Sequence, residues 1–141
     1  MIERFYKPDS SFVYVRFGLD IDGKQVLQHM LSYNKETKDR IGLLELCDCR
    51  TITSLSTTLT TNSLVQSAQL DITEKRVVGG KLAILVPNKL VFGMARAFEI
   101  FARESGRAIG VFYELDEAIE FLNTKESVAE ITEFIKGTEN T

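Results

Sequence analysis

One glycine-bearing segment has the spacing of a phosphate-binding loop. Gly18 and Gly23 are separated by four residues and followed by Lys24, which matches the first part of the nucleotide-binding pattern G-x-x-x-x-G-K-S/T. Gln25, however, stands where a Ser or Thr hydroxyl would bind magnesium, and Asp20 would place negative charge against the phosphates. We therefore expect a turn rather than nucleotide hydrolysis, with an aspartate of this segment capping the helix that follows.

The same segment and two cysteines are the candidates for metal ligation. A calcium loop that began at Gly18 would end at His29 instead of Glu, so its oxygen ligands cannot be assembled. His29 is the only histidine, which excludes two-histidine zinc sites, and we expect it exposed on the flank of a helix. Cys47 and Cys49 are alternate residues of an extended segment, and the distance between such residues is at or past the long limit for a disulfide. We therefore expect two buried thiols. The sequence predicts neither metal nor cofactor.

Polar residues follow two predicted strands, at the edge where parallel α/β sheets bind ligands. Asp48 and Arg50 end one strand, and Asn88 and Lys89 follow the next. Asn88 can cap the longest predicted helix, whose free N–H groups can hold an anion beside Lys89. The alternative for Asp48 and Arg50 is that they pair with each other or with loop backbone.

Two further features allow both a functional and a structural interpretation. Segment 51–63 is dominated by Ser and Thr. A kinase could phosphorylate one of these residues, adding about −1.5 to −2 charge, or the hydroxyls could satisfy the backbone of an irregular loop. Phe92 lies off the main apolar stripe of its helix, where an aromatic side chain can anchor a partner, although isolated exposed apolar residues are common.

The elements that would position these residues alternate between strands and helices. The predicted strands cover 2–6, 12–17, 41–49, 81–86 and 108–113, and the predicted helices cover 22–34, 64–72, 88–104, 116–122 and 127–136. The first two strands suggest a hairpin, and the later alternation implies right-handed βαβ units and a mainly parallel sheet of four to five strands. Without repeats or linkers, we expect a single domain over 1–141, with its core in about 1–122 and an extra helix at about 127–136.

The overall composition argues against several classes of protein. A net charge of −3, without a strong cluster of Lys and Arg, disfavours nucleic-acid binding. No apolar stretch approaches the roughly 20 residues that span a bilayer, and the N-terminus lacks the order of a signal peptide. We expect a cytoplasmic α/β protein without a membrane span.

Three parts of the sequence resemble a group of small bacterial STAS-like proteins of largely unknown function. They are Leu43–Arg50, Lys81–Pro87 with Leu90–Phe98, and Val111–Leu122. The resemblance implies a SpoIIAA-like fold with an N-terminal strand pair and helices packed on the sheet. Better-studied STAS relatives are anti-sigma-factor antagonists, which bind a kinase or switch partner and are phosphorylated on a Ser at a helix start. The nearest candidates here are Ser54 and Ser56, in a stretch that has neither the Asp nor the Gly of that motif.

From the sequence we expect a non-catalytic STAS-like binding or regulatory module that contacts a protein partner or a second copy of itself. The alternative is a binder of a small anion, nucleotide or lipid-like molecule, or an enzyme, that uses the carboxyl ends of the parallel strands. We expect no catalytic residue, because no nucleophile, base or metal set is assembled. The candidate binding residues are Asp48, Arg50, Ser54, Ser56, Asn88 and Lys89.

Overall fold

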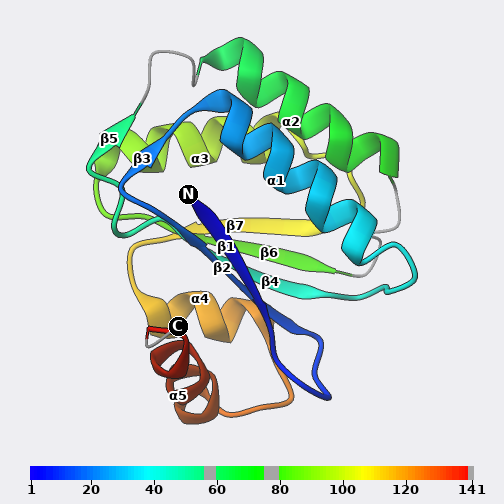
Figure 1. Ribbon diagram of the computed structural model, residues 1–141, viewed down its shortest axis with the longest axis vertical. Coiled ribbons are helices and arrows are strands. Elements are labelled where there is room, and N and C mark those ends of the chain that lie inside the picture. The colour runs from blue at the N-terminus through cyan, green and yellow to red at the C-terminus, as the bar shows by residue number, and fades with distance from the viewer. Residues whose placement is uncertain (56–59, 75–79, 140–141) are drawn as a thin grey trace.

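The computed structural model describes residues 1–55, 60–74 and 80–139 and is built around one five-stranded sheet (Figure 1). Its strands, in spatial order, are β1 (Ile2–Tyr6), β2 (Phe12–Phe17), β4 (Leu44–Asp48), β6 (Lys81–Leu85) and β7 (Ala108–Phe112). β1 and β2 form an antiparallel hairpin, whereas the other neighbours pair in parallel. The expected mainly parallel sheet with an N-terminal strand pair is therefore confirmed. A separate parallel pair joins β3 (Asp20–Ile21) to β5 (Ser54–Leu55).

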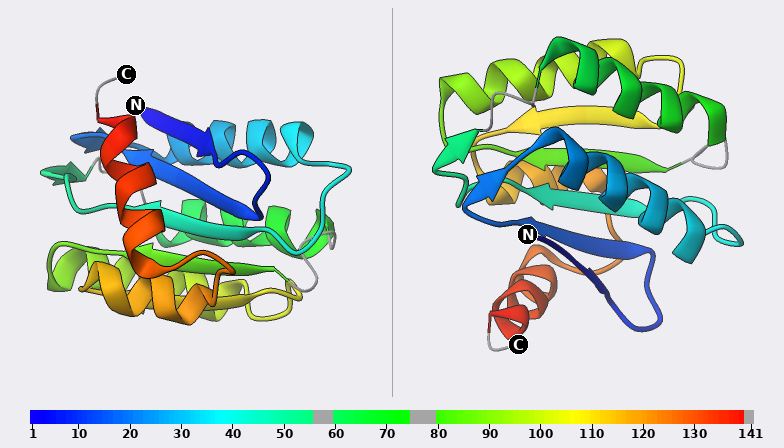
Figure 2. Two further views of the ribbon diagram at one scale, coloured as in Figure 1. Left: turned by 90° about the horizontal axis from the view of Figure 1, so that it is seen from below. Right: turned by 45° about the horizontal axis from the view of Figure 1, so that its top comes forward.

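Helices cover both faces of the sheet. They are α1 (Gly23–Glu36), α2 (Thr61–Glu74), α3 (Lys89–Phe101), α4 (Leu115–Leu122) and α5 (Val128–Thr138). The first three lie on one side of the sheet, and α4 and α5 lie on the other (Figures 1 and 2). Among the described helices, none is long and apolar enough to cross a membrane.

Local side-chain bonds fix where three of these helices begin. The backbone N–H of Gln25 donates to Asp22, that of Val91 donates to Asn88, and that of Glu130 donates to Ser127. Each acceptor satisfies a donor that the first turn of a helix leaves without a partner. The predicted caps at the starts of α1 and α3 are thus confirmed, as is the helix at the end of the chain.

The alternation of side chains along β4 divides its residues between the two faces of the sheet. Glu45 and Cys47 of β4, and Cys49 directly after the strand, face the layer formed by α1, α2 and α3. Leu46 packs in the other hydrophobic cluster with residues of α4 and α5, and Asp48 lies on that same face. Polar groups of one strand therefore belong to two separate environments.

α2 occupies an outer position in its layer. Its main packing partners are α1 and α3, and Figure 1 shows it farther from the sheet than either neighbour. The space between α1 and α3 is therefore bounded by the sheet on one side and by α2 on the other.

Candidate functional site

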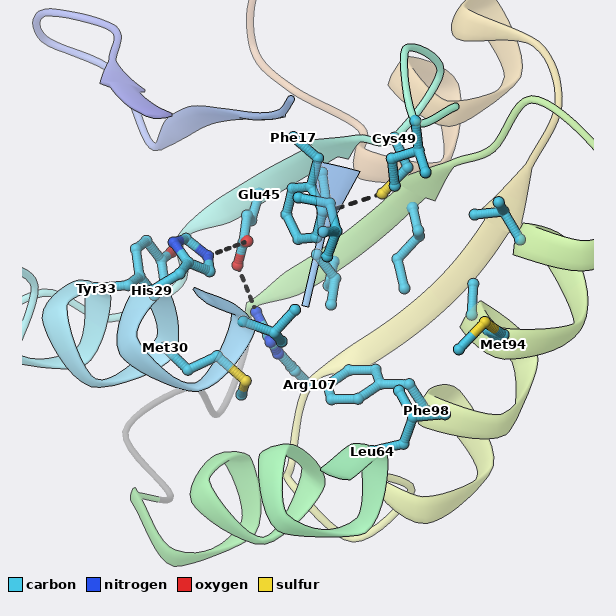
Figure 3. A pocket seen from close by; sticks show the side chains of 18 of the residues that line it. Phe17, His29, Met30, Tyr33, Glu45, Cys49, Leu64, Met94, Phe98 and Arg107 are labelled. Atoms are coloured by element: carbon cyan, nitrogen blue, oxygen red, sulfur yellow. Dashed lines mark hydrogen bonds and ion pairs between the residues drawn. The ribbon is translucent and has the colours of Figure 1, made fainter. Parts of the chain in front are cut away.

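A cavity of about 120 Å³ lies between the sheet and the helices α1, α2 and α3 (Figure 3). Most of the side chains that surround it are apolar, and they include Phe17, Met30, Leu64, Ile84, Met94 and Phe98. They come from each surrounding element: the strands supply alternate residues, and the helices supply their inward faces. A largely apolar cavity with a few polar groups is the usual form of a small-molecule site.

A buried charged cluster borders this cavity. The Arg107 guanidinium donates a 2.9 Å hydrogen bond to Glu45, and His29 Nε2 lies 3.9 Å from the other oxygen of that carboxylate. The side chains of Glu45 and Arg107 are only 5% and 6% exposed. Burial alone would raise the pKa of Glu45, but His29 and Arg107 outweigh burial and lower this pKa to about 2. Glu45 is therefore ionised at neutral pH.

His29 is buried, so the expectation that it would be exposed is wrong. Its Nδ1 lies 3.2 Å from the Arg4 guanidinium, and its ring contacts the rings of Phe17 and Tyr33. Because an arginine side chain can only donate, Nδ1 accepts this hydrogen bond. With Nδ1 as the acceptor, the ring N–H is at Nε2, which faces Glu45.

The polar contacts continue from His29 to the surface. Arg4 donates hydrogen bonds of 3.1 and 2.6 Å to Glu36, which also accepts a 2.7 Å hydrogen bond from the Tyr6 hydroxyl. Arg4 lowers the pKa of Glu36, and burial together with Glu36 raises the pKa of Tyr6 to about 12. From Arg107 to Glu36, these contacts join two arginines and two glutamates. The formal charges of these four side chains therefore balance.

Two thiols also belong to the cavity lining. Cys47 and Cys49 are buried and unbridged, as expected, and their Sγ atoms are 3.8 Å apart. The hydrogen bond with Cys49 and burial together raise the pKa of Cys47 well above its ordinary value. Cys47 therefore keeps its proton at neutral pH.

Asp48 and Arg50 pair with each other, which is the structural alternative considered from the sequence. Asp48 accepts hydrogen bonds of 2.9 to 3.0 Å from the side chain and backbone of Arg50, and a 2.7 Å bond from the Tyr14 hydroxyl. Burial would raise the pKa of Asp48, but these partners lower it. Asp48 lies on the face of β4 opposite the cavity, so it does not contribute to the lining.

Arg50, Asn88 and Lys89 also lie outside the cavity lining. Asn88 uses its side chain to cap α3, and Lys89 is exposed beside it. Asp48 pairs with Leu85 across β4 and β6, so both strands lead to one edge of the sheet. Ser54 lies in β5, and Ser56 falls outside the described residues. A binding role for these residues at that edge stays a prediction.

The apparent phosphate-loop spacing has a packing explanation. The Gly18 N–H donates a 2.7 Å hydrogen bond to the Met1 carbonyl, and a Cβ on Gly18 would lie 2.9 Å from that oxygen. Glycine is therefore required by the close approach of two backbones. Asp22 caps α1, which confirms the expected turn with an aspartate as the helix cap.

The described elements define an α/β protein with a SpoIIAA-like fold, in agreement with the resemblance seen in the sequence. A solved structure that it resembles is an uncharacterized protein of the DUF3478 family, with a SpoIIAA-like fold, from Shewanella loihica PV-4. The two superpose with a TM-score of 0.56 over 86% of this chain and 92% of that chain, at 13% sequence identity. No family model matches the sequence, and the comparison with curated proteins finds no match. An identity this low shows the fold alone.

Proposed function

We propose that this protein is a non-catalytic binding module that holds one small, uncharged and mainly apolar molecule between the sheet and α1, α2 and α3. The observation that carries this proposal is the cavity itself, with its apolar lining and its charge-balanced polar border. This position differs from the one that the sequence predicted for a small-molecule binder, which lay at the carboxyl ends of the parallel strands.

The size of the cavity limits the ligand. Its volume of about 120 Å³ is similar to that of an engineered apolar cavity of about 150 Å³ that binds benzene. A ligand of about the size of one aromatic ring therefore fits without rearrangement. Met30 and Met94 add adaptability, because thioether side chains repack easily around different shapes.

The charges at the border select against ionised ligands. Glu45 and Arg107 already form a buried pair, and the Nδ1 atom of His29 accepts from Arg4. A charged ligand would lose its hydration in the cavity and disturb this balance, which is unfavourable without a new partner. An uncharged ligand with one hydroxyl or carbonyl group avoids that cost.

The same groups support binding rather than covalent catalysis. A nucleophilic cysteine needs a lowered pKa and an adjacent base. The pKa of Cys47 is instead raised, and the two ring nitrogens of His29 face Arg4 and Glu45. These contacts hold a set of polar side chains in fixed positions at one border of the otherwise apolar cavity.

Thermal-shift measurements with four ring compounds test this proposal. We expect toluene and benzyl alcohol to raise the melting temperature, whereas benzoate and benzylammonium do not. A ligand at 100 times its Kd contributes about 2.7 kcal/mol to stability. Ala95→Leu adds bulk to the cavity wall and should abolish the shift, whereas Ala129→Leu adds the same bulk to an exposed position on α5.

Circular dichroism establishes that both leucine variants fold. Equal shifts from charged and uncharged compounds would contradict the charge argument. Unchanged toluene binding by a folded Ala95→Leu variant would place the ligand elsewhere and refute the cavity as the site.

A second proposal is that the carboxyl edge of the sheet contacts a protein partner. Phe92 stacks on Tyr113 with ring centroids 5.1 Å apart, and both Tyr113 and Leu90, at the start of α3, are exposed. Aromatic side chains of this kind often anchor protein interfaces. Capture of a partner should be lost with Leu90→Ser but kept with Leu31→Ser, which changes an exposed leucine on α1. Sedimentation at increasing concentration shows whether that partner is a second copy of the chain.

A further inference from the structure

Sulfur atoms are concentrated at the cavity. The chain contains two cysteines and three methionines, and four of these five residues line this one space. We propose that Cys47 and Cys49 form a modification site that reacts with a small, uncharged disulfide and ends as an intramolecular disulfide. This proposal uses the cavity as a route to the thiols and does not depend on the ligand proposed above.

The geometry brings the two sulfurs together but leaves the product strained. Both side chains face the cavity, and their Sγ atoms are 3.8 Å apart. A disulfide needs about 2.05 Å, so the sulfurs must approach by roughly 1.8 Å. Alternate residues of a strand are also near the long limit of Cα separation for a disulfide. Strained disulfides are easily reduced, so we expect a reversible modification.

The end of β4 is where the required movement can occur. β4 ends at Asp48, and Cys49 is the next residue along the chain. The Cys49 carbonyl accepts a hydrogen bond from the Ile52 N–H, so the chain turns immediately after this cysteine. The Cys49 N–H also donates a 2.8 Å hydrogen bond to the Leu85 carbonyl, so the sulfurs approach mainly by side-chain rotation at this strand end, and the middle of the sheet is unchanged.

The surroundings of the thiols determine which reagents reach them. Both thiols are buried, and they border a space of about 120 Å³ with a mostly apolar lining. Ionised reagents would have to lose their hydration to enter this space. An uncharged aromatic disulfide can enter one ring first, so it is the chemical class that this site would accept.

The reaction has two balanced steps. One cysteine thiolate attacks the reagent disulfide, forms a mixed disulfide and releases one small thiol. The second cysteine then loses its proton and attacks the cysteine sulfur of the mixed disulfide, which forms the Cys47–Cys49 bond and releases the second small thiol. Two protein thiols are oxidised, and one reagent disulfide is reduced to two thiols.

The first step should be slow and the second fast. The raised pKa of Cys47 keeps the thiolate population small at neutral pH, so the first attack accelerates as pH rises. The second step occurs between groups already held in contact, which raises their effective concentration. The mixed disulfide should therefore not accumulate.

Intact-protein mass spectrometry with 4,4′-dithiodipyridine tests the proposal. We expect the folded protein to lose two hydrogens without gaining an adduct, while two thiopyridone molecules are released per chain. Cys47→Ser and Cys49→Ser should each stop at one stable adduct. The dianionic 5,5′-dithiobis(2-nitrobenzoate), which is also an activated aromatic disulfide, should react at least about tenfold more slowly, because its charges oppose entry.

Two stable adducts on the wild-type chain, or no reaction of the folded protein, would overturn the proposal. Equal rates with the charged and uncharged reagents would overturn the cavity as the route. A circular dichroism spectrum that matches the wild type establishes that each serine variant folds. If the Cys47–Cys49 disulfide forms but toluene does not bind, only the proposed function fails. If toluene binds but the disulfide does not form, only this inference fails.

Discussion

Replacing Arg107 with Met provides a stringent test of the buried charged cluster. The substitution removes the 2.9 Å partner of Glu45 and leaves a carboxylate whose side chain is 5% exposed. Breaking a buried ion pair by removing one partner typically costs about 3–5 kcal/mol. His29 and Arg107 together lower the pKa of Glu45 to about 2, so removing Arg107 takes away part of what stabilises the buried carboxylate. We therefore expect Arg107→Met to lose at least about 3 kcal/mol of unfolding free energy.

The pH dependence gives this prediction a distinctive signature. Because the folded-state pKa of Glu45 lies below its ordinary value, its contribution to stability is complete above about pH 4.5 and is lost as pH falls toward 2. Without Arg107 that contribution is smaller at neutral pH. The stability difference between wild type and Arg107→Met should therefore be largest at pH 7 and should narrow at pH 3.

Urea denaturation at pH 7, 5 and 3 measures this difference. Arg96→Met is the matched control, because Arg96 forms an ion pair with Glu99 on the surface of α3. Surface pairs contribute about 0–1 kcal/mol, so the control should change stability little at any of these pH values. Equal losses in both variants, or a difference that stays constant from pH 7 to pH 3, would refute the assigned role of Glu45 and Arg107.

Three further predictions concern other parts of the structure and are measured by urea denaturation. Asn88→Ala removes the side-chain cap of α3 and should cost about 1 kcal/mol; no loss would contradict the cap. Ile131→Ala removes a fully buried side chain of α5 and should cost about 2–5 kcal/mol, whereas Ile41→Ala, at a position 79% exposed, should cost almost nothing. Asp48→Ala leaves the buried Tyr14 hydroxyl without its acceptor and should cost about 1–3 kcal/mol. Adding Tyr14→Phe to this variant should cost little more, because the hydrogen bond is already lost. A second loss of similar size would show that the two groups act independently.

The features predicted correctly from the sequence depend mainly on neighbours along the chain. Asp22 and Asn88 cap their helices through residues three positions later. The pairing of Asp48 with Arg50 was foreseeable as an alternative because the two residues are only two positions apart. The apolar runs and their alternation with helical patterns were enough to predict the parallel sheet.

The cavity and its polar border depend on residues that are distant in the sequence. His29 meets Arg4 of β1 and Glu45 of β4, and Arg107 reaches the same carboxylate from the segment before β7. No helical or strand period reveals such contacts. One signal was present, however: Glu45 interrupts an otherwise apolar buried strand, and a buried charge requires a partner. The position of α2 over the gap between α1 and α3 leaves no comparable trace in the sequence.

Methyl NMR of the three methionines tests the central proposal most directly. Met30 and Met94 line the cavity, whereas Met1 is 74% exposed and serves as an internal control. On titration with toluene, we expect saturable shifts of the Met30 and Met94 methyl signals and a constant Met1 signal. Unchanged Met30 and Met94 signals, or equal shifts of all three, would contradict binding in the cavity.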